Sequence, residues 1–157
     1  MGKVFEDYFS ELQADMVSIC LEYVNDRADK IYIYCSYEEG CISSGVFYCI
    51  NGKVVQRHKL NDALPVVSGK TNFVYDTSGE RQDGVLTILN NNIKKMIHLC
   101  KEYKREMPTE MKLIYDVSKN KLTADYKYDL VYSNDLDKTA DEIEREWFKQ
   151  IQGENSN

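Results

Sequence analysis

Apolar residues recur every three or four positions in three stretches of the chain, and this spacing predicts three amphipathic helices. The helices are expected over residues 4–25, over residues 83–106 with Asp83 as the N-terminal cap, and over residues 139–152. Their apolar faces contain Phe5, Tyr8, Phe9, Leu12, Met16, Ile19, Cys20 and Tyr23; Leu86, Leu89, Ile93, Met96, Ile97, Cys100 and Tyr103; and Ile143, Trp147, Phe148 and Ile151.

Other stretches are rich in β-branched and aromatic residues and predict five strands. These strands are expected at residues 30–37, 42–50, 53–60, 112–117 and 121–130. Asn51 and Gly52 separate the second strand from the third, and this dipeptide predicts a hairpin because a type I′ turn needs positive φ at both central positions. Gly45 lies inside the second strand and indicates a bulge there.

The last predicted strand has the most regular alternation in the chain. Its residues Leu122, Ala124, Tyr126, Tyr128 and Leu130 alternate with Thr123, Asp125, Lys127 and Asp129. A period of two predicts that the first set faces the core and that the second set forms a polar, acidic face.

These elements predict an α+β fold in the order α-β-β-β-(loop)-α-β-β-α, with an antiparallel sheet of about five strands and helices on one face. Residues 61–82 are expected to form a long connection over the sheet edge, in which residues 73–75 are candidates for a short strand. The length of the chain favours a single domain over residues 1–152, followed by a frayed tail at residues 153–157.

The net charge of −6 and the pI near 5.0 disfavour direct binding to nucleic acid, which requires a basic face. The acidic charge favours a basic protein partner. It is explained equally by the solubility that net charge gives to any protein. Five cysteines without metal-ligand spacing, and without a signal peptide, predict reduced thiols in the cytoplasm. No apolar run is long enough to cross a membrane.

Sites for chemistry are not evident in the sequence, which predicts a protein that is not an enzyme. The chain has no Gly-x-Ser-x-Gly motif, and only His58 and His98 are available as imidazole bases. Two histidines and scattered cysteines predict no metal site, and no cofactor is expected. Residues 67–71 resemble the end of a phosphate-binding loop, but Leu64 stands where that motif needs glycine.

The remaining candidate is an acidic surface. Residues 125–146 contain eight acidic and three basic residues, interleaved with Tyr126, Tyr128 and Tyr132 and followed directly by Trp147. Tyrosine and tryptophan often anchor protein interfaces, so this stretch is a candidate site for a basic partner. The predicted partner-binding residues are Asp125, Asp129, Tyr132, Asp135, Asp137 and Asp141. A solvated helix face above an ordinary core, with Trp147 inside that core, explains the same residues equally well.

Several phrases of the sequence resemble the YezG-like family of bacterial immunity proteins. They are the leading amphipathic helix, residues 29–34 (DKIYIY), residues 45–51 (GVFYCIN), a long helix around residues 93–105 and, most closely, residues 122–129 (LTADYKYD). The likeness covers most of residues 5–150, and residues 61–82 differ from the family in length and content.

The resemblance implies a cytoplasmic immunity protein, or antitoxin, used in competition between bacteria. Such a protein binds the C-terminal domain of a cognate secreted polymorphic toxin, typically a nuclease, and masks its active site. The family has no catalytic residues to carry over, and its partner contacts vary between toxin pairs. A small ligand-binding domain or enzyme with a pocket between the sheet and residues 61–82 is the alternative. Self-association is left open.

Overall fold

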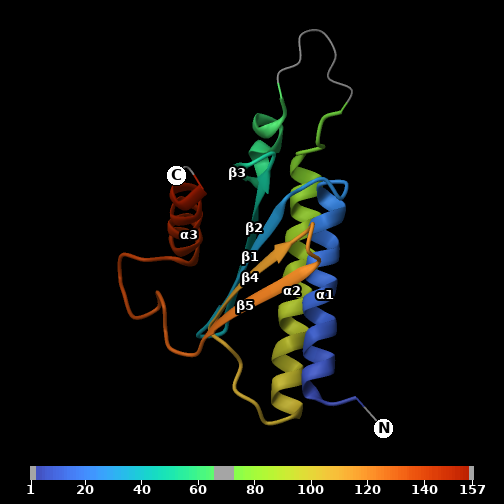
Figure 1. Cartoon of the computed structure of the whole chain (residues 1–157). Coiled ribbons are helices and arrows are strands. Elements are labelled where there is room, and N and C mark those ends of the chain that lie inside the picture. Colours follow the sequence, from blue (N-terminus) through green and yellow to red (C-terminus); the bar gives the residue numbers. More distant parts are fainter. Residues whose placement is uncertain (1–2, 66–72, 156–157) are drawn as a thin grey trace.

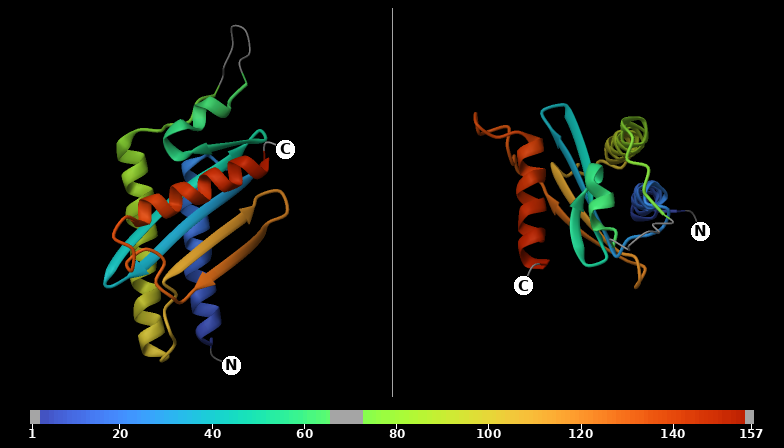
Figure 2. Two further views of the ribbon diagram at one scale, coloured as in Figure 1. Left: turned by 90° about the vertical axis from the view of Figure 1, so that its left-hand side faces the viewer. Right: turned by 90° about the horizontal axis from the view of Figure 1, so that it is seen from above.

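A five-stranded antiparallel sheet in the order β3-β2-β1-β4-β5 lies between two layers of helix in the computed structural model, which describes residues 3–65 and 73–155 (Figures 1 and 2). The elements are α1 (Phe5–Tyr23), β1 (Lys30–Glu38), β2 (Cys41–Ile50), β3 (Lys53–Gln56), the 3₁₀ helix η1 (Arg57–Ala63), α2 (Gly79–Glu102), β4 (Glu110–Asp116), β5 (Lys121–Lys127) and α3 (Ala140–Asn155). The predicted α+β class and the order of helices and strands are confirmed.

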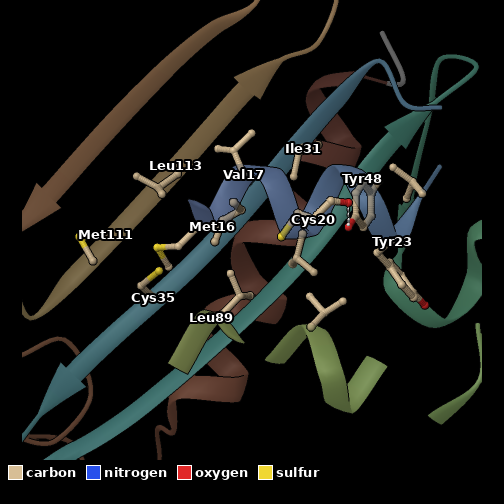
Figure 3. Packing of buried hydrophobic residues seen from close by; sticks show 14 of the residues in the cluster. Met16, Val17, Cys20, Tyr23, Ile31, Cys35, Tyr48, Leu89, Met111 and Leu113 are labelled. Carbon is tan, nitrogen blue, oxygen red and sulfur yellow. Dashed lines mark hydrogen bonds between the residues drawn. The ribbon is translucent and has the colours of Figure 1, made fainter. Parts of the chain in front are cut away.

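Helices α1 and α2 pack side by side on one face of the sheet and bury the larger core (Figures 1 and 2). Met16 and Cys20 of α1 meet Ile31 and Cys35 of β1 and Leu89 of α2 in this core (Figure 3). Met16, Cys20 and Leu89 are among the residues that the helical spacing predicted for the inner faces of α1 and α2. The hydroxyl groups inside this core have partners, as where Tyr48 Oη donates a hydrogen bond of 2.8 Å to the Cys20 carbonyl oxygen.

Helix α3 covers the opposite face of the sheet, so the prediction that the helices share one face is wrong (Figure 2). Trp147 and Ile143 of α3 pack there against Tyr32 and Tyr34 of β1 and Phe47 of β2. The cause lies in the sequence of β1, which is buried from Ile31 through Ser36 without a polar face. A strand that is apolar on both faces needs cover on both.

The boundaries of three elements around residues 57–79 differ from the prediction. The third strand ends at Gln56 instead of residue 60, and the chain then turns into η1. Phe73, Val74 and Tyr75 do not form a strand, because the backbone of Tyr75 bonds the side chain of Asn61 in both directions. Helix α2 begins at Gly79, since the Ser78 hydroxyl accepts a bond from the Arg81 N–H and caps the helix ahead of Asp83.

The last strand is also shorter than predicted. Strand β5 ends at Lys127, and Tyr126, Tyr128 and Leu130 are 40%, 49% and 42% exposed. Leu122 and Ala124 of the predicted inner row pack against the larger core, whereas Tyr126 contacts only its margin, at Phe9. The predicted alternation of inner and outer side chains holds within β5, but Tyr126 and Tyr128 lie at its end, where the sheet no longer covers them.

Smaller expectations are also settled. Gly45 pairs directly with Tyr34 in an unbroken register, so it forms no bulge. Helix α3 continues to Asn155, whose side chain bonds the Gly52 carbonyl oxygen, so residues 153–155 are helical rather than a frayed tail.

Candidate protein-binding surface

The acidic segment between β5 and α3, residues 128–139, is fixed to the sheet by a buried carboxylate. Glu38, the last residue of β1, is 2% exposed. Its side-chain oxygens accept hydrogen bonds from the backbone N–H groups of Val131 (2.9 Å), Tyr132 (3.4 Å) and Ser133 (3.0 Å). Three converging N–H groups form a small anion-binding nest, and the carboxylate fills it.

Burial alone would raise the pKa of Glu38, because a carboxylate loses hydration inside a protein. The hydrogen bonds from Val131, Ser133 and Tyr132 act the other way and prevail, so the pKa of Glu38 is lowered. Glu38 is therefore ionised at neutral pH and holds the segment firmly. The sequence analysis missed this residue, although a glutamate that follows Tyr34 and Ser36 on one face of a buried strand is the available signal.

Two further contacts support the same segment. The Thr109 hydroxyl donates to the carbonyl oxygens of Lys127 (3.1 Å) and Asp129 (2.6 Å) just after β5. The hydroxyl of Tyr132 lies 3.1 Å from the Ser36 hydroxyl, and its ring is half-buried against the smaller core. Tyr132, predicted as a partner-binding residue, therefore packs on the sheet and connects the segment to it.

Asp135 and Asp137 lie at the outer turn of this segment, on either side of Leu136. The side chain of Asp135 accepts a bond of 2.9 Å from the Asp137 N–H, and the Asp135 N–H bonds the Tyr132 carbonyl oxygen at 3.0 Å. Leu136 between them is fully exposed. The segment thus presents two carboxylates and an apolar side chain to solvent on an ordered turn.

Asp125 and Asp129 have basic neighbours. Asp125 lies opposite Lys112 in the β4–β5 register, on the face that α3 covers. Asp129 lines a hollow of about 660 Å³ between β5 and α3, together with Lys112, Lys127 and Lys138. The negative charge of this part of the surface is therefore partly offset.

Asp141 belongs to a different hollow of about 260 Å³ at the start of α3, which Arg57, His58 and Glu144 also line. Glu144 is largely buried, and its carboxylate lies 3.3 Å from the Arg57 guanidinium. Burial raises the pKa of Glu144, and the Arg57 charge counteracts the shift only in part. The six predicted residues therefore do not form one cluster. Asp129, Tyr132, Asp135 and Asp137 share the segment, in which Tyr132 is half-buried, while Asp125 and Asp141 lie outside it.

The structure offers little for chemistry within residues 3–65 and 73–155. No group of three or more His, Cys, Asp or Glu side chains there is arranged to hold a metal ion. Four of the cysteines are buried, and burial raises the pKa of the Cys20, Cys35, Cys49 and Cys100 thiols, which disfavours the reactive thiolate. No helix in this part of the chain is long and apolar enough to span a bilayer.

The alternative pocket between the sheet and residues 61–82 involves residues 66–72, which lie outside the described part of the chain. Near the start of that connection, the Arg57 hollow and a neighbouring one of about 270 Å³ beside β3 are shallow features between the sheet edge and α3. Both are smaller than a usual small-molecule pocket.

Comparison of the sequence with models of known protein families gives no match, and a search of curated proteins finds no relative. The resemblance to YezG-like immunity proteins therefore rests on the sequence phrases alone.

Proposed function

We propose that this chain is an immunity protein that binds and neutralises a cognate secreted bacterial toxin, a nuclease, by masking its active site. The protein acts by binding, without catalysis or a cofactor, and its partner is the toxin's C-terminal domain. The observation that carries the proposal is the acidic segment around Asp135 and Asp137, whose backbone is held by the buried Glu38 carboxylate.

A segment of this kind suits a nuclease for an electrostatic reason. Nuclease active sites are basic because they bind phosphates, and carboxylates on an ordered surface can take the place of those phosphates. Ordering the segment before binding reduces the conformational entropy lost in the complex. The exposed Leu136 adds an apolar side chain between the two carboxylates. Protein interfaces often have this arrangement, in which an apolar anchor is surrounded by charged groups.

The test uses the C-terminal domain of a candidate toxin, which is to be sought in the reading frames next to this gene. The triple variant Asp129→Asn, Asp135→Asn and Asp137→Asn removes three charges and keeps side-chain oxygens for the turn at Asp135. We expect association with the toxin to slow about tenfold at low salt, and the difference from the wild-type chain to shrink as salt screens the charges. Surface plasmon resonance measures the rate, and rescue of cells that express the toxin measures protection.

The matched control is the triple variant Glu22→Gln, Asp83→Asn and Glu102→Gln, which removes the same charge from exposed positions on α1 and α2. It should associate with the toxin nearly as fast as the wild-type chain. Equal slowing in both triples would mean that net charge alone matters and that the acidic segment is not the binding surface. A wild-type chain that neither binds the toxin nor rescues the cells would refute the immunity function.

A further inference from the structure

Strand β5 is an outer strand of the sheet, and within the described residues no strand pairs with its outer side. Its seven residues, Lys121–Lys127, contain no proline, so each keeps its backbone N–H, and lysines stand only at the two ends of the strand. An unpaired edge of this kind is a template for backbone pairing.

The backbone hydrogen bonds at the two ends of β4 determine which backbone groups of β5 point outward. The Tyr37 N–H bonds the Thr109 carbonyl oxygen, and the Val117 N–H bonds the Asp29 carbonyl oxygen, so the odd-numbered residues of β4 bond β1. In an antiparallel sheet the even-numbered residues of β4 must then bond β5, where they pair with odd-numbered residues. The N–H and C=O groups of Leu122, Ala124 and Tyr126 therefore face outward.

An aromatic groove of about 400 Å³ lies at the end of this edge, on the side of α1. Phe5, Phe9, Tyr126 and Tyr128 form much of its wall. The ring of Tyr126 is fixed, because its hydroxyl accepts a 2.7 Å hydrogen bond from Gln13 and its edge packs on Phe9 at 6.2 Å. Glu6, Arg105 and Glu106 also line the groove, so it offers an aromatic wall beside charged groups, in a space of a size that holds a large side chain.

The other face of the edge is charged. Lys121, Asp125 and Lys127 point to the α3 side, alternating with the small and apolar side chains of Leu122 and Ala124. A strand added beside β5 would have one row of side chains near these charges and the other near the aromatic groove.

We propose that β5 is the docking edge for an extended segment of a protein partner, which adds a sixth strand to the sheet and places an aromatic or large aliphatic side chain in the groove. Backbone bonds to Leu122, Ala124 and Tyr126 supply register, and the groove supplies side-chain selectivity. The inference concerns the mode of contact with a partner, so it and the toxin proposal fail separately.

A second copy of this chain fits the edge less well. Two copies of β5 could pair antiparallel around a central residue. With Thr123 at the centre, Ser118 of the second copy would lie opposite Tyr128, and with Ala124 at the centre, Asn120 would lie there. In both registers a polar turn would face the aromatic groove. Pairing about Asp125 would bring Leu122 of the second copy opposite Tyr128, but it would also set the two Asp125 side chains against each other. A foreign segment with a suitable side chain avoids both conflicts.

The test uses a display library of random ten-residue peptides selected against the full chain. We expect enriched peptides to share an aromatic or large aliphatic residue and to lose about a hundredfold in affinity for Ala124→Pro. That proline removes an outward N–H and places its ring in the path of the added strand, but it breaks no bond to β4. The matched variant Ala124→Ser keeps the N–H and should bind within about twofold of the wild-type chain, and Tyr128→Ser tests the groove with an expected loss of about tenfold.

Amide hydrogen exchange of the wild-type chain tests the same proposal without any substitution. The amides of Leu122, Ala124 and Tyr126 should exchange fast in the free protein and slow at least tenfold when a selected peptide binds, while Thr123 and Asp125 stay slow throughout. Failure to enrich any peptide, or equal binding of the peptides to Ala124→Pro, would overturn the proposal. So would protection of these three amides in a free protein that sediments as a dimer, because the edge would then belong to a second copy.

Discussion

At the scale of single residues, Glu38 shows how one buried charge can order a distant segment. It connects the end of β1 to backbone groups 93 to 95 residues further along the chain. No local pattern in the sequence reports contacts over such a distance, which is why the acids after β5 could be predicted as a surface but not as an ordered one. Tyr132 illustrates the same limit, since its contact with Ser36 depends on the fold.

We predict that Glu38→Gln lowers the free energy of unfolding by about 2–4 kcal/mol, because an amide NH₂ group would face N–H donors and leave some of them unpaired. Urea denaturation measures the loss, and faster amide exchange at Val131 and Ser133 would place it in this segment. Glu39→Gln is the control: Glu39 is the exposed neighbour of Glu38, so its change should cost less than about 0.5 kcal/mol. Equal effects of the two variants would contradict the role of Glu38.

The same contact has a defined pH dependence. The pKa of Glu38 is lowered in the folded protein from an ordinary value of 4.5, so its contribution is complete above that value and is lost as the pH falls toward the folded pKa. The stability difference between the wild-type chain and Glu38→Gln should therefore be constant near neutral pH and should shrink below about 4.5. A difference that persists unchanged in acid would mean that the charge of Glu38 is not involved.

At the scale of elements, periodicity predicted which segments form helices and strands, but not how α3 docks. The apolar face of α3 was evident from Ile143 and Trp147, while the sheet face it covers depended on β1 being buried on both sides. The docking also needs Gly45 of β2, because a Cβ at this position would overlap the Glu144 carboxyl group. In the sequence this glycine was taken for a bulge, since a close approach from a segment about a hundred residues away has no local signal.

We predict that Gly45→Ala lowers the free energy of unfolding by about 1–2 kcal/mol, because Glu144 must move away from Arg57 to make room. In a Glu144→Ala background the same change should cost less than half as much, and the double-mutant cycle measured by chemical denaturation gives the coupling. Gly84→Ala is the control within α2: no atom approaches that position, so it should stabilise the protein by up to about 1 kcal/mol. If Gly45→Ala lowered the free energy of unfolding equally with and without the Glu144 side chain, contact with Glu144 would not be the cause of the loss.

At the scale of the whole molecule, one sheet joins two separate cores. The larger core contains Leu89, and the smaller one contains Trp147, the single tryptophan of the chain. Consecutive residues of β1 belong to alternate cores, as Ile33 and Tyr34 do, so neither core can lose its packing without disturbing the strand that the other requires. This arrangement favours one cooperative unfolding transition.

We therefore predict that Leu89→Ala lowers the free energy of unfolding by about 2.5–5 kcal/mol and shifts two probes together. Far-UV circular dichroism reports the helices and strands. Trp147 fluorescence reports the smaller core beneath α3, which covers the face of the sheet opposite α1 and α2 (Figure 2). Leu136→Ala is the matched control, because Leu136 is fully exposed and the same truncation should change stability by less than about 0.5 kcal/mol. If the fluorescence transition stayed in place while the dichroism transition moved, the two cores would unfold independently and α3 would be a separately folding cover on the sheet.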